Sequence, residues 1–468
     1  MLEQHIGPAV FRAGVRGYLQ RHAYGNADTN DLWVSLGHAA QQPVPDLMNG
    51  WIFQTGIPLL TAAVTGGSEL TLTQQRFSYL PQASAGDQLW QVPVQIRIVT
   101  DDQVEHRRLL LTDRHTTVSL PPNVQQVIVN EAGHGFYRVR YDSTLLQRLL
   151  NGGLDRLASV ERFNVVSDAW ATTVAGHMPL DEYVDLTAHF RHERDKNVWA
   201  VLLDSFSFFN RIVADSDRPA LEAFVRSRLS PVVAELGWEP AAGENHLVRQ
   251  LRGELIGALG KLGNDPVTQQ QAVEHYQRYT EDPAAVDPNL LPAIVVILAH
   301  TGDISRYEEF SARYQRAQTP QEERRYLFSL AAFKEPALLA RTLARSTNGE
   351  MRTQDAPFMV SAVLGNVYGR AQAWNFVKAH WDEMERLFPK QGLRRMCGGF
   401  VALATPELER EVLEFVTTRK VDLGGKTLAQ YLEQLRIAVA FREREASRLP
   451  TYLAQTGRLR AEGIGVVR

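Results

Sequence analysis

The chain has 468 residues, of which 44% are hydrophobic and 22% are charged, and its formal net charge is −3. These proportions are typical of a globular protein and exclude a disordered or fibrous chain. At roughly 100–200 residues per domain, the length predicts two to four domains. No basic excess marks the sequence, and this argues against nucleic acid as a partner.

The single cysteine, Cys397, excludes an intramolecular disulfide and a metal site with several cysteine ligands. With no histidine nearby in the sequence, it is interpreted as a small buried hydrophobic residue. The first residues, MLEQHIGPAVFRAG, lack the apolar core of a signal peptide. The longest apolar run near the middle, Leu290 to Ala299, is shorter than the roughly 20 residues that cross a membrane. We therefore expect a cytoplasmic protein with no membrane partner.

Residues 1–55 are predicted to be helical, because apolar residues recur at helical spacing and Asp28 or Thr29 is placed to cap a helix. Short helices of this kind are too few to enclose a core, so we expect Leu2, Phe11, Val15 or their apolar neighbours to form an exposed patch. The turn at residues 55–58, TGIP, then ends the helical segment.

Residues 56–142 change to the period of a β-strand, and turn clusters separate the short strands at nearly regular spacing. Val92, Val94 and Ile96, for example, alternate with residues of the opposite face. The pattern predicts an antiparallel β-sandwich. Pro93 cannot donate to a ladder and is therefore expected at an edge or a bulge.

Residues 143–468 return to helical spacing, with loops rich in Gly, Asp, Asn and Pro about every 15–20 residues. So many short helices cannot form one bundle, which favours a curved solenoid of antiparallel helix pairs. The fold class is thus a multidomain α and β protein. Its three predicted domains are a helical segment at 1–55, a β-sandwich at 56–142 and an all-α solenoid at 143–468.

A self-contained catalytic site is not found among the sequence motifs. His192-Glu193 begins like a zinc-peptidase helix, but Lys196 occupies the position of the second histidine. The segment at 424–427, GGKT, lacks the first glycine of a phosphate-binding loop and is interpreted as a helix start. We therefore expect no catalytic residue, no metal ligand and no cofactor in this chain.

One polar cluster, Arg352-Thr353-Gln354-Asp355, opens a helix after a turn at Asn348-Gly349. Two interpretations remain open for it. The residues either cap the start of a helix, which is the commoner use of such side chains, or face a cavity and contact a peptide.

The order of a helical end, a β-sandwich and a long helical region resembles the C-terminal portion of zinc aminopeptidases related to aminopeptidase N, puromycin-sensitive aminopeptidase and the endoplasmic-reticulum aminopeptidases. The resemblance covers essentially the whole chain in order. It rests on these segments and residues: 1–19, MLEQHIGPAVFRAGVRGYL; 24–33, YGNADTNDLW; 48–58, MNGWIFQTGIP; 75–77, QRF; 89–93, LWQVP; 135–142, GFYRVRYD; Glu161-Arg162; Asp168-Ala169; 352–355, RTQD; and 373–376, AWNF.

The resemblance implies that residues 1–55 are the last helices of a thermolysin-like catalytic domain. The family's H-E-x-x-H zinc helix, its further Glu ligand, its G-A-M-E-N motif and its catalytic Tyr belong upstream and do not occur here. Zinc is thus implied for the complete family enzyme only. In the family the helical domain forms a bowl over the zinc site, and its wall contacts peptides. Carried over, Arg352, Gln354 and Asp355 are the candidate peptide-binding residues.

Two functions of different classes follow. In the first, the chain is the non-catalytic part of a zinc aminopeptidase, which closes over the peptide and meets its catalytic half in cis or in trans. In the second, it is a free-standing helical scaffold that binds a protein partner. The retained helices of residues 1–55 favour the first, because they are useful only next to a catalytic domain.

Overall fold

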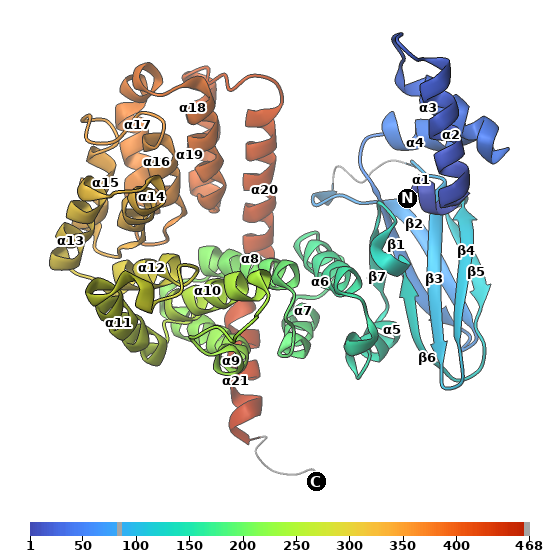
Figure 1. Cartoon of the computed structure of the whole chain (residues 1–468), viewed down its shortest axis with the longest axis horizontal. Coiled ribbons are helices and arrows are strands. Elements are labelled where there is room, and N and C mark those ends of the chain that lie inside the picture. The colour runs from blue at the N-terminus through green and yellow to red at the C-terminus, as the bar shows by residue number, and fades with distance from the viewer. Residues whose placement is uncertain (82–86, 463–468) are drawn as a thin grey trace. The chain divides into compact units, whose positions relative to one another are not determined.

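The computed structural model describes residues 1–81 and 87–462 (Figure 1). The chain divides into two compact units, Met1–Pro179 and Leu180–Arg468. In the described part of the chain, no helix combines the length and apolar character needed to cross a membrane.

The first unit begins with four helices, as the sequence predicts: α1 (Leu2–Ile6), α2 (Pro8–Arg21), α3 (Thr29–Ala40) and α4 (Val44–Ile52). Asp28 caps α3, because its side chain accepts from the backbone N–H groups of Asn30 and Asp31. The helices enclose a small core of Leu2, Ile6, Leu36, Val44 and Leu47. The expectation of an exposed Leu2 is therefore wrong, since this side chain helps to fill the core.

The β-sandwich is confirmed. Its strands are β1 (Pro58–Thr65), β2 (Glu69–Arg76), β3 (Val92–Thr100), β4 (Val104–Leu111), β5 (His115–Ser119), β6 (Val124–Val129) and β7 (Arg138–Tyr141). They form a four-stranded sheet of order β5-β2-β1-β7 and a three-stranded sheet of order β4-β3-β6. All strand pairs are antiparallel except β1 with β7, which run parallel. A parallel pair needs a long connection rather than a hairpin, and here the other five strands separate its two members.

Pro93 has no N–H group to donate to a neighbouring strand, and yet it lies in β3, the central strand of its sheet. On one side Pro93 pairs with Leu110 of β4, but the pairing of β3 with β6 begins only at Ile96. The strand is therefore a local edge at Pro93, as a residue without an N–H group requires. The expected edge position is confirmed.

Helix α4 is fixed to the sandwich by two side chains. The indole Nε1 of Trp51 donates to the carbonyl of Gln91 at 3.0 Å, and Nε2 of Gln54 donates to the carbonyl of Leu89 at 3.2 Å. The rings of Trp51 and Trp90 lie 6.4 Å apart. The helices of residues 1–52 thus have a defined attachment to the strands that follow.

The change from strand to helix occurs where the sequence pattern places it, between Tyr141 and Ser143. The first unit nevertheless continues through α5 (Ser143–Leu150), the 3₁₀ turn η3 (Leu154–Arg156) and α6 (Ser159–Val174). Another 3₁₀ turn, η2 (Glu131–Gly133), precedes β7. The three predicted domains stay a prediction, because compactness groups α5 and α6 with the sandwich.

The second unit is built of helices, which confirms the predicted all-α character of this region. They are α7 (Leu180–Leu186), α8 (Lys196–Ile212), α9 (Arg218–Leu236), α10 (His246–Lys261), α11 (Pro266–Glu281), α12 (Leu291–Thr301), α13 (Ile304–Arg316), α14 (Pro320–Ser329), α15 (Pro336–Ala344), α16 (Ala356–Gly365), α17 (Arg370–Leu387), α18 (Lys390–Cys397), α19 (Pro406–Thr418), α20 (Thr427–Glu445) and α21 (Leu449–Glu462). Short 3₁₀ turns connect some of them: η4 (Thr187–Phe190), η5 (Asp215–Asp217), η6 (Pro283–Ala285), η7 (Leu330–Ala332) and η8 (Gly398–Ala402).

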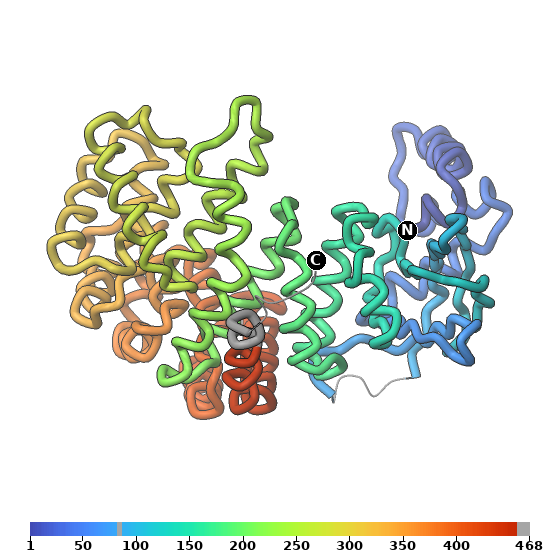
Figure 2. Tube along the Cα trace, turned by 90° about the horizontal axis from the view of Figure 1, so that it is seen from below, coloured from blue at the N-terminus to red at the C-terminus, as the bar shows by residue number. Residues whose placement is uncertain are grey.

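Many successive helices of this unit contact one another, for example α9 with α10, α11 with α12 and α13 with α14, and the last helices also return to the first. Helix α21 packs against α9 and α7 (Figure 2). The rings of Phe208 in α8 and Phe441 in α20 lie 5.3 Å apart. Arg370, at the start of α17, donates to the carbonyl of Arg211 at the end of α8 at 2.8 Å. These contacts between distant helices place side chains from both ends of the unit around one interior region.

Candidate functional site

The three residues predicted to bind peptide lie between α14 and α16. The Arg352 guanidinium forms an ion pair with Glu323 at 3.0 Å, and Asp355 accepts from Arg324 at 2.8 Å. Two neighbouring residues of α14 therefore hold two residues of the predicted cluster. Asp355 is buried, whereas Arg352 and Gln354 are exposed.

Asp355 occupies the N-cap position of α16, but its side chain makes no capping hydrogen bond. The carboxylate is instead used by Arg324, so the capped-start interpretation is correct for the position and wrong for the side chain. Arg324 is half exposed but the Asp355 carboxylate is buried, so this pair compensates a buried charge and helps to hold α16 against α14. Contact of Arg352, Gln354 and Asp355 with a peptide stays a prediction.

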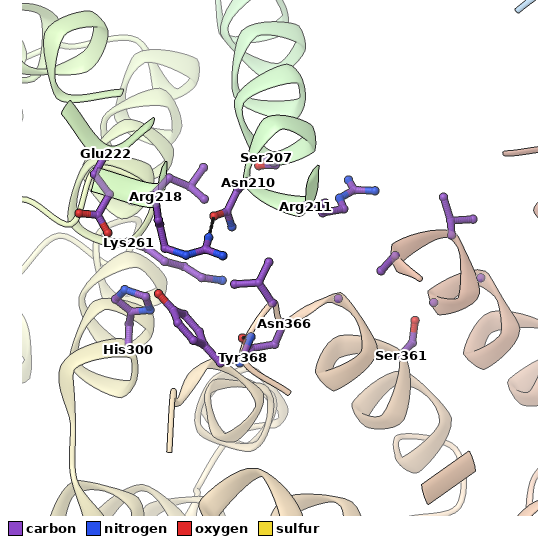
Figure 3. Close-up of a pocket in the computed structure, with 17 residues that line it drawn as sticks. Ser207, Asn210, Arg211, Arg218, Glu222, Lys261, His300, Ser361, Asn366 and Tyr368 are labelled. Atoms are coloured by element: carbon purple, nitrogen blue, oxygen red, sulfur yellow. Dashed lines mark hydrogen bonds between the residues drawn. The ribbon is translucent and has the colours of Figure 1, made fainter. Parts of the chain in front are cut away.

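A cavity of about 360 Å³ lies within the helical unit, away from these three residues. Its wall is formed by α8, α9, α10 and α12, by the turn after α16 and by η8 (Figure 3). Charged and polar side chains from several of these elements point toward one another. They are Asn210, Arg218, Glu222, Lys261, His300 and Tyr368.

Arg218 is buried and held by its neighbours. Its guanidinium donates to the side-chain oxygen of Asn210, and to Asp215 at 2.7 Å. It also lies over the ring of Tyr368, 5.5 Å from the centroid, where a cation is attracted to the electron-rich face. Arg218 is thus a positioned cation with fixed donors rather than a mobile surface side chain.

Lys261 is the last residue of α10 and lines the same cavity. Its side chain is open to the cavity, yet the surrounding protein lowers the pKa of its ammonium group through the cost of burial. Within residues 1–81 and 87–462, the structure gives this ammonium no ion pair and no hydrogen-bond partner. It is therefore a cation without a counter-ion.

His300 in α12 is buried beside these cations. Burial, together with the smaller effects of the nearby charges of Lys334, Lys261 and Arg218, lowers its pKa to about 3. The imidazole is therefore neutral at neutral pH, with one ring N–H able to donate. Its low pKa results mainly from burial, and the neighbouring cations add to the shift.

Arg211, near the end of α8, also lines the cavity, and Arg370 of α17 donates to its backbone carbonyl. Arg211 lies apart from the group around Lys261 (Figure 3), and burial lowers its pKa although Asp204 acts in the opposite direction. Burial, together with the smaller effects of the nearby Arg442 and Arg218, lowers the pKa of Arg370 to about 10. The cavity is thus suited to hold an anionic group by charge and by hydrogen bonds.

Zinc would need three or more suitably grouped ligands, and no such group of His, Cys, Asp and Glu exists in the described part of the chain. The residues present therefore do not fit a catalytic zinc site. Cys397 is fully buried, and burial raises the pKa of its thiol to about 12. This confirms its interpretation as a small hydrophobic residue.

The cavity residues were missed by the sequence patterns. Arg218, Lys261, His300 and Tyr368 come from four elements, and their separation in the chain gives no fixed spacing. All four lie at or near a helix end or in a turn, where a polar residue is ordinary. One sequence feature could have pointed to the cavity. It is the run NVYGR at 366–370, which forms a turn between two helices.

Comparison with known proteins adds a family context to this geometry. The model of the ERAP1-like C-terminal domain matches residues 126–437, and that of the peptidase family M1 domain matches residues 1–51. Aminopeptidase M1 of Arabidopsis thaliana is 29% identical over 463 residues, which cover 93% of this chain and 52% of the relative.

Two further relatives have similar coverage. Aminopeptidase 2, mitochondrial, of Saccharomyces cerevisiae is 26% identical over 98% of this chain and 48% of its own length. Glutamyl aminopeptidase of Bos taurus is 26% identical over 87% of this chain and 43% of its own length. The chain therefore spans about half the length of the curated relatives it matches.

Proposed function

The chain belongs to the family of the ERAP1-like C-terminal domain, and from this premise we propose that it acts as the non-catalytic region of a zinc aminopeptidase. In this role it closes over a bound peptide and shapes the chamber that holds it. Removal of the N-terminal residue of the peptide then depends on a zinc-bearing half, in the same chain or bound from another. We place this activity in the cytoplasm, without a nucleic-acid or membrane partner.

The observation that carries the proposal is the fold of the segment that matches the peptidase M1 domain. Residues 1–51 form four short helices around a core of only five buried side chains. Phe11 and Val15 are only partly covered there, and Leu19 and Tyr24 are exposed. A set of helices with so small a core is typical of one part of a larger domain.

Hydrolysis of a peptide bond by this class of enzyme uses a metal-bound water, typically with three protein ligands and an open fourth position. The described residues contain no suitable ligand group, so this chemistry is assigned to the zinc-bearing half. The present chain supplies binding and positioning. The basic cavity supports this division, because it offers charged and polar contacts to a peptide without a hydrolytic group.

The contacts to peptide that we propose include the three residues selected from the sequence. Arg352, which is ion-paired with Glu323, and Gln354 are exposed and can contact a ligand, whereas Asp355 is buried and would act by holding the turn. A peptide that contacts this turn would gain from the Arg352 charge if its own side chains are acidic.

Association with the zinc-bearing half provides the test. We expect the chain to form a 1:1 complex with the zinc-bearing half of an M1 aminopeptidase from the same source, measured by sedimentation velocity. Leu19→Asp should weaken this complex at least tenfold, because Leu19 is 61% exposed on α2 and a buried carboxylate is costly. Val267→Asp, on an exposed residue of the helical unit, is the matched control.

Equal affinity for the Leu19→Asp and control proteins would exclude this surface of α2 from the interface. Absence of any complex would contradict the proposal itself and favour a free-standing scaffold that binds a protein partner. Thermal melting of both variants shows whether either change has disturbed the fold, because neither side chain belongs to a core.

A further inference from the structure

We propose that the basic cavity of the helical unit is a binding site for a dianionic phosphate group, held by Lys261 and Arg218 and completed by Tyr368. This site lies among α8, α9, α10 and α12. The side chains that define it point toward one another in Figure 3.

The charge of the lining matches a dianion. Three of its side chains are cations, Arg211, Arg218 and Lys261, and one is a carboxylate, Glu222. His300 is neutral for the reason given above. The lining thus has two more cations than carboxylates. Asp215, outside the lining, pairs with Arg218, whereas Lys261 has no such partner among the described residues, so the cavity favours an anionic ligand.

The two central cations, Arg218 and Lys261, differ in whether they already have side-chain partners. Arg218 already has Asp215 and Asn210 as partners, so it is held in place before any ligand arrives. Lys261 has no carboxylate partner among the described residues, and its side chain is exposed toward the cavity. A cation in this position gains most from an anion, because the anion removes the cost of an uncompensated charge.

Tyr368 adds an oriented hydrogen-bond donor to the charged lining. Arg218 lies over its ring at 5.5 Å and Lys334 at 5.6 Å from the centroid, so that two cations fix its orientation. Its ring lies 6.2 Å from that of His300. A hydroxyl and a neutral imidazole are hydrogen-bond donors that suit phosphate oxygens, which accept several bonds at once.

The size of the cavity leaves room for a group attached to the phosphate. About 360 Å³ falls within the range of small-ligand pockets and exceeds the volume of a bare phosphate ion. The phosphate can therefore belong either to a small phosphate ester or to a phosphorylated side chain of a peptide. Both sources present the same dianionic group.

The test is isothermal titration of the whole chain with inorganic phosphate at pH 7.5 and low salt. We expect saturable binding at one site, which weakens as salt is added. Lys261→Met should reduce the affinity at least tenfold, and Tyr368→Phe should reduce it by a smaller factor. Lys390→Met, at an exposed lysine of α18, is the matched control and should bind as the unmodified chain does.

Titration of phosphoserine peptide and of glycerol phosphate then separates the two sources of the group, and tighter binding of either one identifies the source. The proposal is overturned if phosphate does not bind, if Lys261→Met binds as tightly as Lys390→Met, or if acetate binds as tightly as phosphate. Binding needs neither zinc nor a partner protein. Its failure would therefore leave the aminopeptidase proposal intact, and the reverse also holds.

Discussion

Replacement of Glu161 by alanine is expected to lower the stability of the first unit by about 3 kcal/mol, because a buried carboxylate with three donors is removed. One oxygen of Glu161 accepts from Arg97 at 2.8 Å and from the backbone N–H of Ala158 at 2.9 Å. The other accepts from the N–H of Ala132 at 3.0 Å. Glu161 therefore joins the start of α6 to β3 and to η2.

The expected loss lies at the lower end of the range for buried pairs, because Arg97 keeps Glu131 at 3.6 Å. Glu161→Gln should cost less than alanine, since its amide oxygen still accepts one or two of these bonds. Hydrogen exchange measured by mass spectrometry over residues 131–133 and 159–174 detects the loss locally. Glu69→Ala, at an exposed strand position, is the control and should change stability by less than about 0.5 kcal/mol. Unchanged protection of α6 in Glu161→Ala would contradict this role.

Asp168, two turns further along α6, is expected to make the stability of the first unit depend on pH. Its carboxylate accepts from Arg138 at 3.0 Å and from the N–H of Val139 at 2.9 Å, both in β7. Burial raises the pKa of Asp168 to about 6, although Arg138 acts against this shift. Asp168→Ala should destabilise the unit by about 3–5 kcal/mol at neutral pH, because Arg138 and Val139 lose their partner.

The sign of the pH effect follows from the raised pKa. Because folded Asp168 binds its proton more tightly than the unfolded residue does, its contribution is fully present below pH 4 and is lost as the pH rises through about 6. Asp168→Asn keeps an acceptor for Val139 but cannot titrate. We therefore expect the free energy of unfolding, measured with urea, to fall more between pH 5 and pH 7.5 for the unmodified chain than for Asp168→Asn. Equal losses would show that Asp168 has an ordinary pKa.

The strands and helices could be predicted from the sequence because they depend on local spacing. The change of period near Asp142 agrees with the end of β7 at Tyr141, and the Asp28 cap follows from its position before an apolar stripe. Side-chain alternation and capping involve residues a few positions apart, so the sequence contains the necessary information.

The contacts that join these elements could not be predicted from the sequence, because the residues that form them are far apart in the chain. Glu161 reaches Arg97 across 64 residues, and nothing in the spacing of either residue specifies the other. The parallel pairing of β1 with β7 and the return of α21 to α9 are likewise set by tertiary packing. The same reason explains why the sequence selected Arg352 and Asp355, which are neighbours, and missed Lys261 and Tyr368, which are not.

We propose that this chain completes a zinc aminopeptidase without carrying its chemistry. Hydrolysis of an aminoacyl reporter substrate by the chain, by the zinc-bearing half and by their mixture tests it most directly, with zinc content measured for each. We expect no hydrolysis and no stoichiometric zinc in the chain alone, and hydrolysis in the mixture well above that of the zinc-bearing half. Hydrolysis by the chain alone, abolished by a chelator and restored by zinc, would contradict the account.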